Sequence, residues 1–261
     1  MQKKEVSLTG FNAGKLNVNI LHDRKMVGES AAKNVAKTIG RILEIKDEVR
    51  IIFAAAPSQN EFLEYLTSLS NIPWEKIAAF HMDEYISLPK TAPQLFSRYL
   101  NEHIFSKVNF KSVDIINSGV DDIEAECLRY EKLLSEKEID IVCMGIGENG
   151  HIAFNDPPVA DFNDKRLVKI VELDEICKNQ QVNDGAFNSV DEVPKFAATL
   201  TVPALMRAKY LSVVVPGIRK AEAVRETING DISTKCPATI LRTHENAVLF
   251  LDKHSASMLE Q

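Results

Sequence analysis

Short runs of hydrophobic residues alternate along this chain with stretches whose apolar positions recur at helical spacing. The hydrophobic runs are brief and rich in β-branched residues, a pattern typical of buried strands. They cover Val49–Ala56, Lys76–Met82, Ser112–Asn117, Ile139–Met144, Tyr210–Val215 and Ala247–Leu251. The helical stretches are Gln59–Leu69, Pro93–His103, Asp121–Ser135 and Arg219–Asn229.

This alternation predicts an α/β fold: a doubly wound, mostly parallel sheet with helices on both faces. Right-handed crossovers then place the loops that follow the strands along one edge of the sheet, where such folds bind their ligands. No repeat or long linker interrupts the pattern, so we expect a single domain over residues 1–261. The polar stretch 160–193 is the least regular, and we expect a lid or a helical excursion there.

Composition narrows the possible functions. Hydrophobic residues make up 45% of the 261 and charged residues 26%, as in ordinary soluble proteins. A net charge of −6 argues against generic binding to nucleic acid. No apolar run approaches the length of a membrane span, and the N-terminus has no hydrophobic core of a signal peptide. The four cysteines lack metal-site spacing, so we expect a cytoplasmic protein with reduced thiols.

A glycine-rich segment, Gly145–Pro158, follows the fourth hydrophobic run and contains a histidine. Its three glycines allow a sharp turn and close approach of the backbone to a ligand. His151 lies between Asn149 and Asp156, whose polar groups are able to fix the tautomer of an imidazole. The Gly-x-Gly-x-x-Gly pattern also occurs in dinucleotide sites, but Pro157–Pro158 excludes the helix that such sites require. A glycine-rich turn with a packed histidine remains the simpler alternative.

Other loops that follow predicted strands also carry polar side chains. Ser58 and Gln59 open a helix whose amides suit a phosphate, although Ser58 also fits as a plain helix cap. Asp83 and Glu84 follow the second strand, and alternation along the strand predicts that only one of them faces the cleft. Lys220 lies at the start of a helix, where a cation opposes the helix dipole and a bound anion would explain it.

These residues together resemble a known family. Phe80–Pro89 and Gly145–Pro157 are similar to the two signature motifs of glucosamine-6-phosphate deaminases, also called isomerases. Pro216–Ala223 and Pro237–His244 match later blocks of that family, in the same order and at similar spacing. The resemblance implies a Rossmann-like fold and conversion of glucosamine 6-phosphate, or an epimer such as galactosamine 6-phosphate, to a ketose 6-phosphate and ammonia. It implies no metal and no cofactor.

The resemblance also implies roles for particular residues. Asp83 matches the family's general base, which moves a proton between C2 and C1 of the opened amino sugar. His151 matches the histidine that assists ring opening, and Lys220 matches the phosphate-binding lysine. Asn149 and Asp156 would then support His151 as further catalytic residues. The other residues expected at the substrate are Ser58, Gln59, Glu84, Gly147 and Gly150.

The chain also departs from the best-known family members. Asn149 stands where they have an aspartate, and Asp156 where they have a glutamate. The segment Gln180–Gly185 lacks the arginine that they carry there, and the loop around Ser58 differs from their threonine- and glycine-rich turn. These differences indicate a divergent branch.

The expected partner is a small amino-sugar phosphate, with neither nucleic acid nor a membrane. The resemblance also implies a homo-oligomer, because the family often forms trimers or hexamers. Two alternatives stay open: a phosphosugar lactone hydrolase of the 6-phosphogluconolactonase kind, and a sugar-phosphate sensor without catalysis. The full Met-Asp-Glu-Tyr motif at 82–85 argues against the first alternative, and the retention of both Asp83 and His151 argues against the second.

Overall fold

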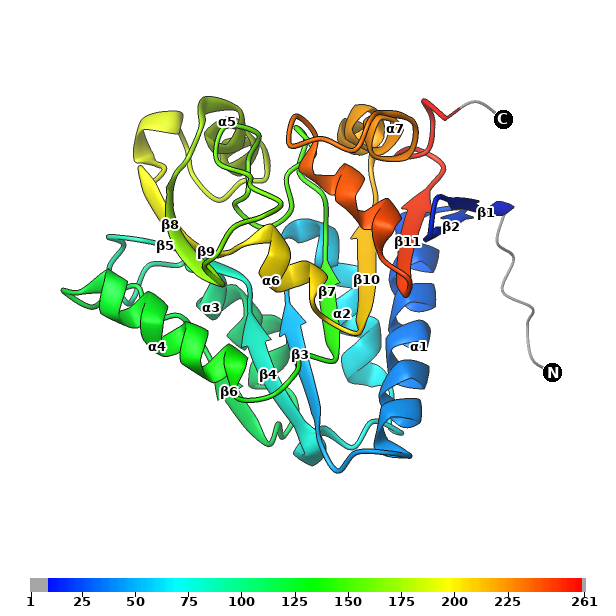
Figure 1. Ribbon diagram of the computed structural model, residues 1–261, viewed down its shortest axis with the longest axis horizontal. Helices are drawn as coiled ribbons and strands as arrows, with labels where there is room; N and C mark the ends of the chain where they lie inside the picture. Colours follow the sequence, from blue (N-terminus) through cyan, green and yellow to red (C-terminus); the bar gives the residue numbers. More distant parts are fainter. Residues whose placement is uncertain (1–8, 260–261) are drawn as a thin grey trace.

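The predicted strands are six adjacent strands of an eight-stranded sheet in the computed structural model, which describes residues 9–259 (Figure 1). Across the sheet the order is β1-β2-β11-β10-β7-β3-β4-β6. Among these strands the β1–β2 pair is antiparallel and the others pair in parallel. The strands are β1 (Thr9–Ala13), β2 (Leu16–Leu21), β3 (Val49–Phe53), β4 (Ile77–His81), β6 (Ser112–Asp114), β7 (Ile141–Met144), β10 (Tyr210–Val215) and β11 (Ala247–Asp252).

Helices cover both faces of this sheet because strand side chains alternate between two hydrophobic cores. Ile51 and Phe53 of β3 face the core formed with α1 and α2, whereas Ile52 faces the core formed with α4, α6 and α7. The helices are α1 (Arg24–Leu43), α2 (Asn60–Ser68), α3 (Phe96–Leu100), α4 (Ile123–Ser135), α5 (Glu175–Asn183), α6 (Val202–Met206) and α7 (Ala221–Asn229). The predicted fold class, with its mostly parallel sheet covered on both faces, is confirmed.

A second, three-stranded antiparallel sheet lies beyond the carboxyl ends of the main strands (Figure 1). It consists of β5 (Asp83–Tyr85), β9 (Phe196–Leu200) and β8 (Val168–Glu172), in that order. Tyr85, Phe154 and Phe187 are buried in its separate hydrophobic core, which also receives Cys177 of α5. This small sheet and α5 cover the edge at which the sequence predicts a ligand site.

Several elements differ from the sequence-based expectation. The irregular stretch 160–193 contains β8 and α5, so the expected helical excursion is confirmed. The hairpin of β1 and β2, and the long helix α1, were not among the predicted elements. β5 was also missed, because three residues are too few to show a period. Single-domain organisation over 1–261 stays a prediction, and residues 1–8 and 260–261 lie outside the described part.

The described residues contain no helix that is both long and apolar enough to cross a bilayer. All four cysteines are free thiols, at positions 127, 143, 177 and 236.

Candidate active site

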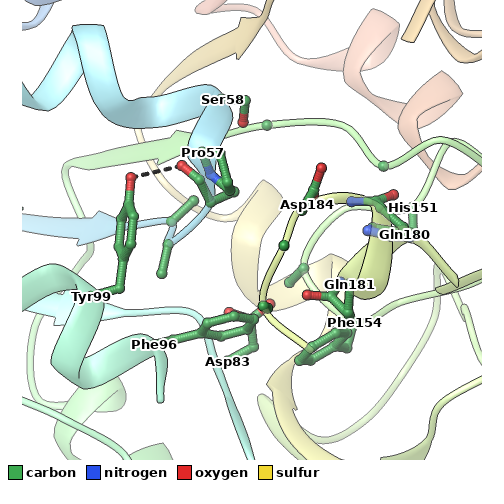
Figure 2. Close-up of a pocket in the computed structure, with 18 of the residues that line it drawn as sticks. Pro57, Ser58, Asp83, Phe96, Tyr99, His151, Phe154, Gln180, Gln181 and Asp184 are labelled. Carbon is green, nitrogen blue, oxygen red and sulfur yellow. Dashed lines mark hydrogen bonds between the residues drawn. The ribbon is translucent and has the colours of Figure 1, made fainter. Parts of the chain in front are cut away.

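A cavity of about 570 Å³ opens at the carboxyl ends of the parallel strands, under α5. Five of the ten site residues predicted from the sequence line it, although they come from loops far apart in the chain (Figure 2). They are Ser58, Asp83, Gly147, His151 and Lys220. The other five do not line the cavity: Gln59, Glu84, Asn149, Gly150 and Asp156.

His151 is held by the two residues that the sequence placed beside it. Its Nδ1 lies 2.8 Å from Oδ1 of Asp156, and Asn149 donates to the same Oδ1 from 2.8 Å. The Asn149 side-chain oxygen in turn accepts the backbone N–H of His151 at 3.0 Å. Nδ1 is therefore occupied by Asp156, and Nε2 is the ring nitrogen that remains for a ligand.

Asp156 is suited to hold the imidazole because it stays ionised despite its burial. Burial opposes the charge of this carboxyl, but His151 and the hydrogen bond from Asn149 outweigh that effect and lower its pKa. Asp156 is 1% exposed and does not line the cavity, so its carboxylate contacts His151 and leaves contact with a ligand to the imidazole. The pair has the arrangement of a general acid–base histidine with its orienting carboxylate.

The glycines of this loop make room for neighbouring side chains. A Cβ at position 147 would lie 2.2 Å from Cε1 of His151, so the imidazole lies directly over Gly147. Gly150 has a φ of 82°, which favours glycine, and a Cβ there would meet Sγ of Cys236 at 2.4 Å. Gly147 therefore borders both the cavity and the histidine, whereas Gly150 shapes the loop behind them.

Asp83 and Glu84 point to different sides of β5, as alternation along the strand predicts. Asp83 lines the cavity, and burial together with the carboxylates of Glu84 and Asp156 raises its pKa well above the ordinary range. Glu84 is fully buried and accepts three backbone N–H groups, those of Tyr85, Phe96 and Ser97, at 2.8 to 3.0 Å. In this structure Glu84 thus organises the start of α3, away from the cavity.

A second group of residues at this cavity suits an anion. Lys220 is only 9% exposed and forms no ion pair among residues 9–259. Burial lowers the pKa of this lysine, and this effect outweighs the opposing charges of Asp184 and Glu148. Ser58 lines the same cavity, and Gln59 stands behind it, donating to the Ser58 hydroxyl at 3.1 Å and to the carbonyl of Val214 at 3.3 Å.

Sequence reasoning missed the contribution of α5 to the cavity wall. Gln180, Gln181 and Asp184 all line the cavity. Asp184 is neutralised by Arg219, whose guanidinium lies 2.9 Å from its carboxylate. In the sequence, this segment stood out only because it lacks an arginine that family members carry. The two adjacent glutamines in a polar helix were the feature that could have indicated a cavity wall.

One group of potential metal ligands touches the site. Atoms of His151, Asp156 and Cys177 lie within 4.8 Å of one another. However, the 2.8 Å contact between Nδ1 and the carboxylate is a hydrogen bond. Two ligands on one tetrahedral zinc ion would lie farther apart, roughly 3.3 Å for bonds of about 2.0 Å. The trio as it stands is therefore arranged as a hydrogen-bonded group.

Comparison with known proteins assigns the chain to a family. Residues 22–250 match the family described as glucosamine-6-phosphate isomerases/6-phosphogluconolactonase. The chain belongs to this family. A glucosamine-6-phosphate deaminase of Listeria monocytogenes is 35% identical over 81% of this chain and 88% of its own length. Another, of Clostridium acetobutylicum, is 34% identical over 94% of this chain and 100% of its own. The family resemblance predicted from the motifs is confirmed.

Solved structures agree with this membership. A monomeric glucosamine-6-phosphate deaminase superposes with a TM-score of 0.84 at 30% identity, covering 92% of this chain and 99% of that one. A 6-phosphogluconolactonase of Thermotoga maritima gives a TM-score of 0.74 at 23% identity, covering 91% and 100%. The second likeness establishes the shared fold alone.

Proposed function

We propose that this family member is an enzyme that converts glucosamine 6-phosphate and water to fructose 6-phosphate and ammonia. The observation that carries the proposal is that Asp83, the His151–Asp156 pair and the buried Lys220 meet at one cavity. The named deaminases at 34–35% identity support it, as does the motif at 82–85.

The reaction begins with opening of the pyranose ring. Nε2 of His151 exchanges a proton with the ring oxygen while Asp156 holds Nδ1. Asn149 supports this pair with a hydrogen bond to Asp156, without adding a second negative charge. An imidazole suits this step because it gains and loses a proton near neutral pH.

Proton transfer between neighbouring carbons follows. The Asp83 carboxylate removes the proton from C2 and returns it to C1, while a proton passes from the amine nitrogen to O1. The amino aldehyde thereby becomes a ketimine with a hydroxyl on C1. Water then adds at C2 and the nitrogen leaves as ammonia, so that one water is consumed for each ammonia released. The raised pKa of Asp83 makes it a stronger base once ionised than an exposed carboxylate.

The phosphate anchors the substrate at the far end of the cavity. Lys220 supplies the charge, and Ser58 with the turn at 57–59 supplies hydrogen-bond donors. Binding energy from the phosphate thereby holds C1 and C2 against Asp83. Gln59, Glu84 and Gly150 act behind this surface, through Ser58, α3 and the histidine loop respectively.

The test is ammonia release from glucosamine 6-phosphate, measured with the purified protein and coupled to formation of a ketose phosphate. Galactosamine 6-phosphate and 6-phosphogluconolactone are assayed in parallel. Stoichiometric ammonia and ketose phosphate are the expected result. Rapid lactone opening without ammonia would instead assign lactone hydrolysis, and binding of sugar phosphate without turnover would indicate a sensor.

Two further expectations belong to this proposal. A substrate of central sugar metabolism suits a cytoplasmic enzyme with reduced thiols, and all four cysteines are free. The solved deaminase at 30% identity is described as monomeric, so light scattering of this protein decides between a monomer and the homo-oligomer expected from the family.

A further inference from the structure

One cavity-lining side chain has a polar group to which the proposed reaction gives no role. Gln180 of α5 is more than nine-tenths buried, with 7% of its surface exposed. Its Nε2 has no hydrogen-bond partner among residues 9–259, yet this atom is not sealed in the protein interior. A carboxamide in such a place has two N–H donors available to a ligand.

The orientation of this carboxamide is fixed by the histidine loop. The backbone N–H of Glu148 donates to Oε1 of Gln180 at 2.8 Å. A backbone N–H only donates, so the atom that faces it has to be the oxygen. Nε2 is therefore turned away from the loop. On the next residue, Gln181, the oxygen is likewise occupied, by the Tyr85 hydroxyl at 2.6 Å.

The position of Gln180 determines which part of a ligand its carboxamide can contact. Figure 2 shows Gln180 beside His151, on the wall between Ser58 at one end of the cavity and Asp83 at the other. In the proposed function these ends hold the phosphate on C6 and the reacting carbons C1 and C2. His151 serves the ring oxygen, which is bonded to C5. The hydroxyl next to that carbon, on the side away from the phosphate, is the one on C4.

We propose that Gln180 donates a hydrogen bond to the C4 hydroxyl of the sugar phosphate and thereby discriminates between C4 epimers. This inference rests on the proposed function for the direction in which the substrate lies. Inverting C4 moves the hydroxyl to the other face of the chain and leaves the buried N–H without an acceptor. A site built to hydrogen-bond a hydroxyl rejects analogues that misplace it. The wild type accordingly prefers glucosamine 6-phosphate over galactosamine 6-phosphate by tenfold or more in kcat/KM.

Two substitutions separate donation to the substrate from support of the loop. Gln180→Glu keeps an oxygen for the Glu148 N–H but removes the donor, whereas Gln180→Met removes both at similar length. The added charge in Gln180→Glu weakens binding of both epimers alike, so the ratio of their kcat/KM values is the readout. Asn179→Ala is the matched control, because Asn179 lies on the exposed face of the same helix and donates only to the carbonyl of Glu175.

If Gln180 donates to the C4 hydroxyl, both variants bring the ratio of the kcat/KM values for the two epimers to within about threefold of one. Asn179→Ala retains the wild-type ratio. The inference is overturned if Gln180→Glu retains the wild-type ratio while Gln180→Met lowers kcat equally for both epimers. That pattern would show that Gln180 only supports the loop. A wild type that does not discriminate between the epimers would overturn it as well.

Binding without turnover keeps this test separate from the proposed function. Calorimetry measures the affinities of the wild type and variants for glucitol 6-phosphate and its C4 epimer, galactitol 6-phosphate. A wild-type preference that both variants lose supports the reading of C4 even if neither amino sugar releases ammonia. Equal affinity of the wild type for the two polyol phosphates refutes it even if ammonia is released.

Discussion

Asp83→Asn tests the base of the proposed reaction with almost no change in shape. The carboxamide keeps the volume of the side chain but is unable to accept the proton from C2. A positioned general base contributes about 10²- to 10⁴-fold, so kcat for ammonia release should fall by that factor, or by about 2.7 to 5.4 kcal/mol in the activation free energy. Affinity for fructose 6-phosphate should stay within about threefold, because Ser58 lies at the other end of the cavity from Asp83 and the proposed phosphate ligand Lys220 is unchanged.

The same substitution should also change stability, in a direction set by the pKa of Asp83. Burial, followed by the charges of Glu84 and Asp156, raises this pKa in the folded state. The folded protein thus holds the proton more tightly than the unfolded chain, and stability falls as the pH rises from about 3.9 to the raised pKa. The slope approaches 1.4 kcal/mol per pH unit, at about one proton per molecule. Asp83→Asn lacks this loss and should be the more stable protein at pH 7.

Urea unfolding of both proteins at pH 4.5, 6 and 7.5 measures this difference, alongside kcat and the affinity for fructose 6-phosphate at pH 7.5. The expected result is a stability advantage of Asp83→Asn that grows with pH. An equal loss of kcat and affinity would refute the division between a reacting end and an anchoring end. A stability difference independent of pH would refute the cause assigned to the raised pKa.

Three further substitutions test other parts of the site. Gly147→Ala places a Cβ 2.2 Å from the His151 ring and should lower the free energy of unfolding by about 1–3 kcal/mol, together with kcat. Wild-type values in both urea unfolding and the ammonia assay would contradict the packing described. Asp156→Asn should lower kcat about 100-fold because it releases His151. The pKa of Asp156 is lowered in the folded protein, so the wild type should be more stable than the variant above about pH 4. In thermal melts this difference should disappear as the pH falls further. Lys220→Met should raise the melting temperature of the free protein, because the buried ammonium forms no ion pair. Inorganic phosphate should stabilise the wild type and leave the variant unchanged; a phosphate effect that persists in the variant would place the anion elsewhere.

The different roles of Asp83 and Glu84 show which features the local sequence pattern predicts and which it does not. Alternation along a strand predicted that only one of the two acids faces the cleft, and the structure places Asp83 there. It did not predict that Glu84 accepts the N–H groups of Phe96 and Ser97, which lie more than ten residues later. Such a contact depends on the path of the intervening loop, which no local period encodes.

The sequence by itself determined the parallel sheet and the family, and five of the ten site residues it named line the cavity. It could do so because buried strands need continuous apolar runs, and because proton transfer and phosphate binding each require particular side chains. Only the tertiary structure decided which polar atoms remain free to meet a ligand. Gln180 became informative once the Glu148 N–H was seen to fix its oxygen, and Lys220 once its burial without an ion pair was known. Hydrogen-bond partners distant in sequence settle these questions, since they depend on how loops from separate strands pack together.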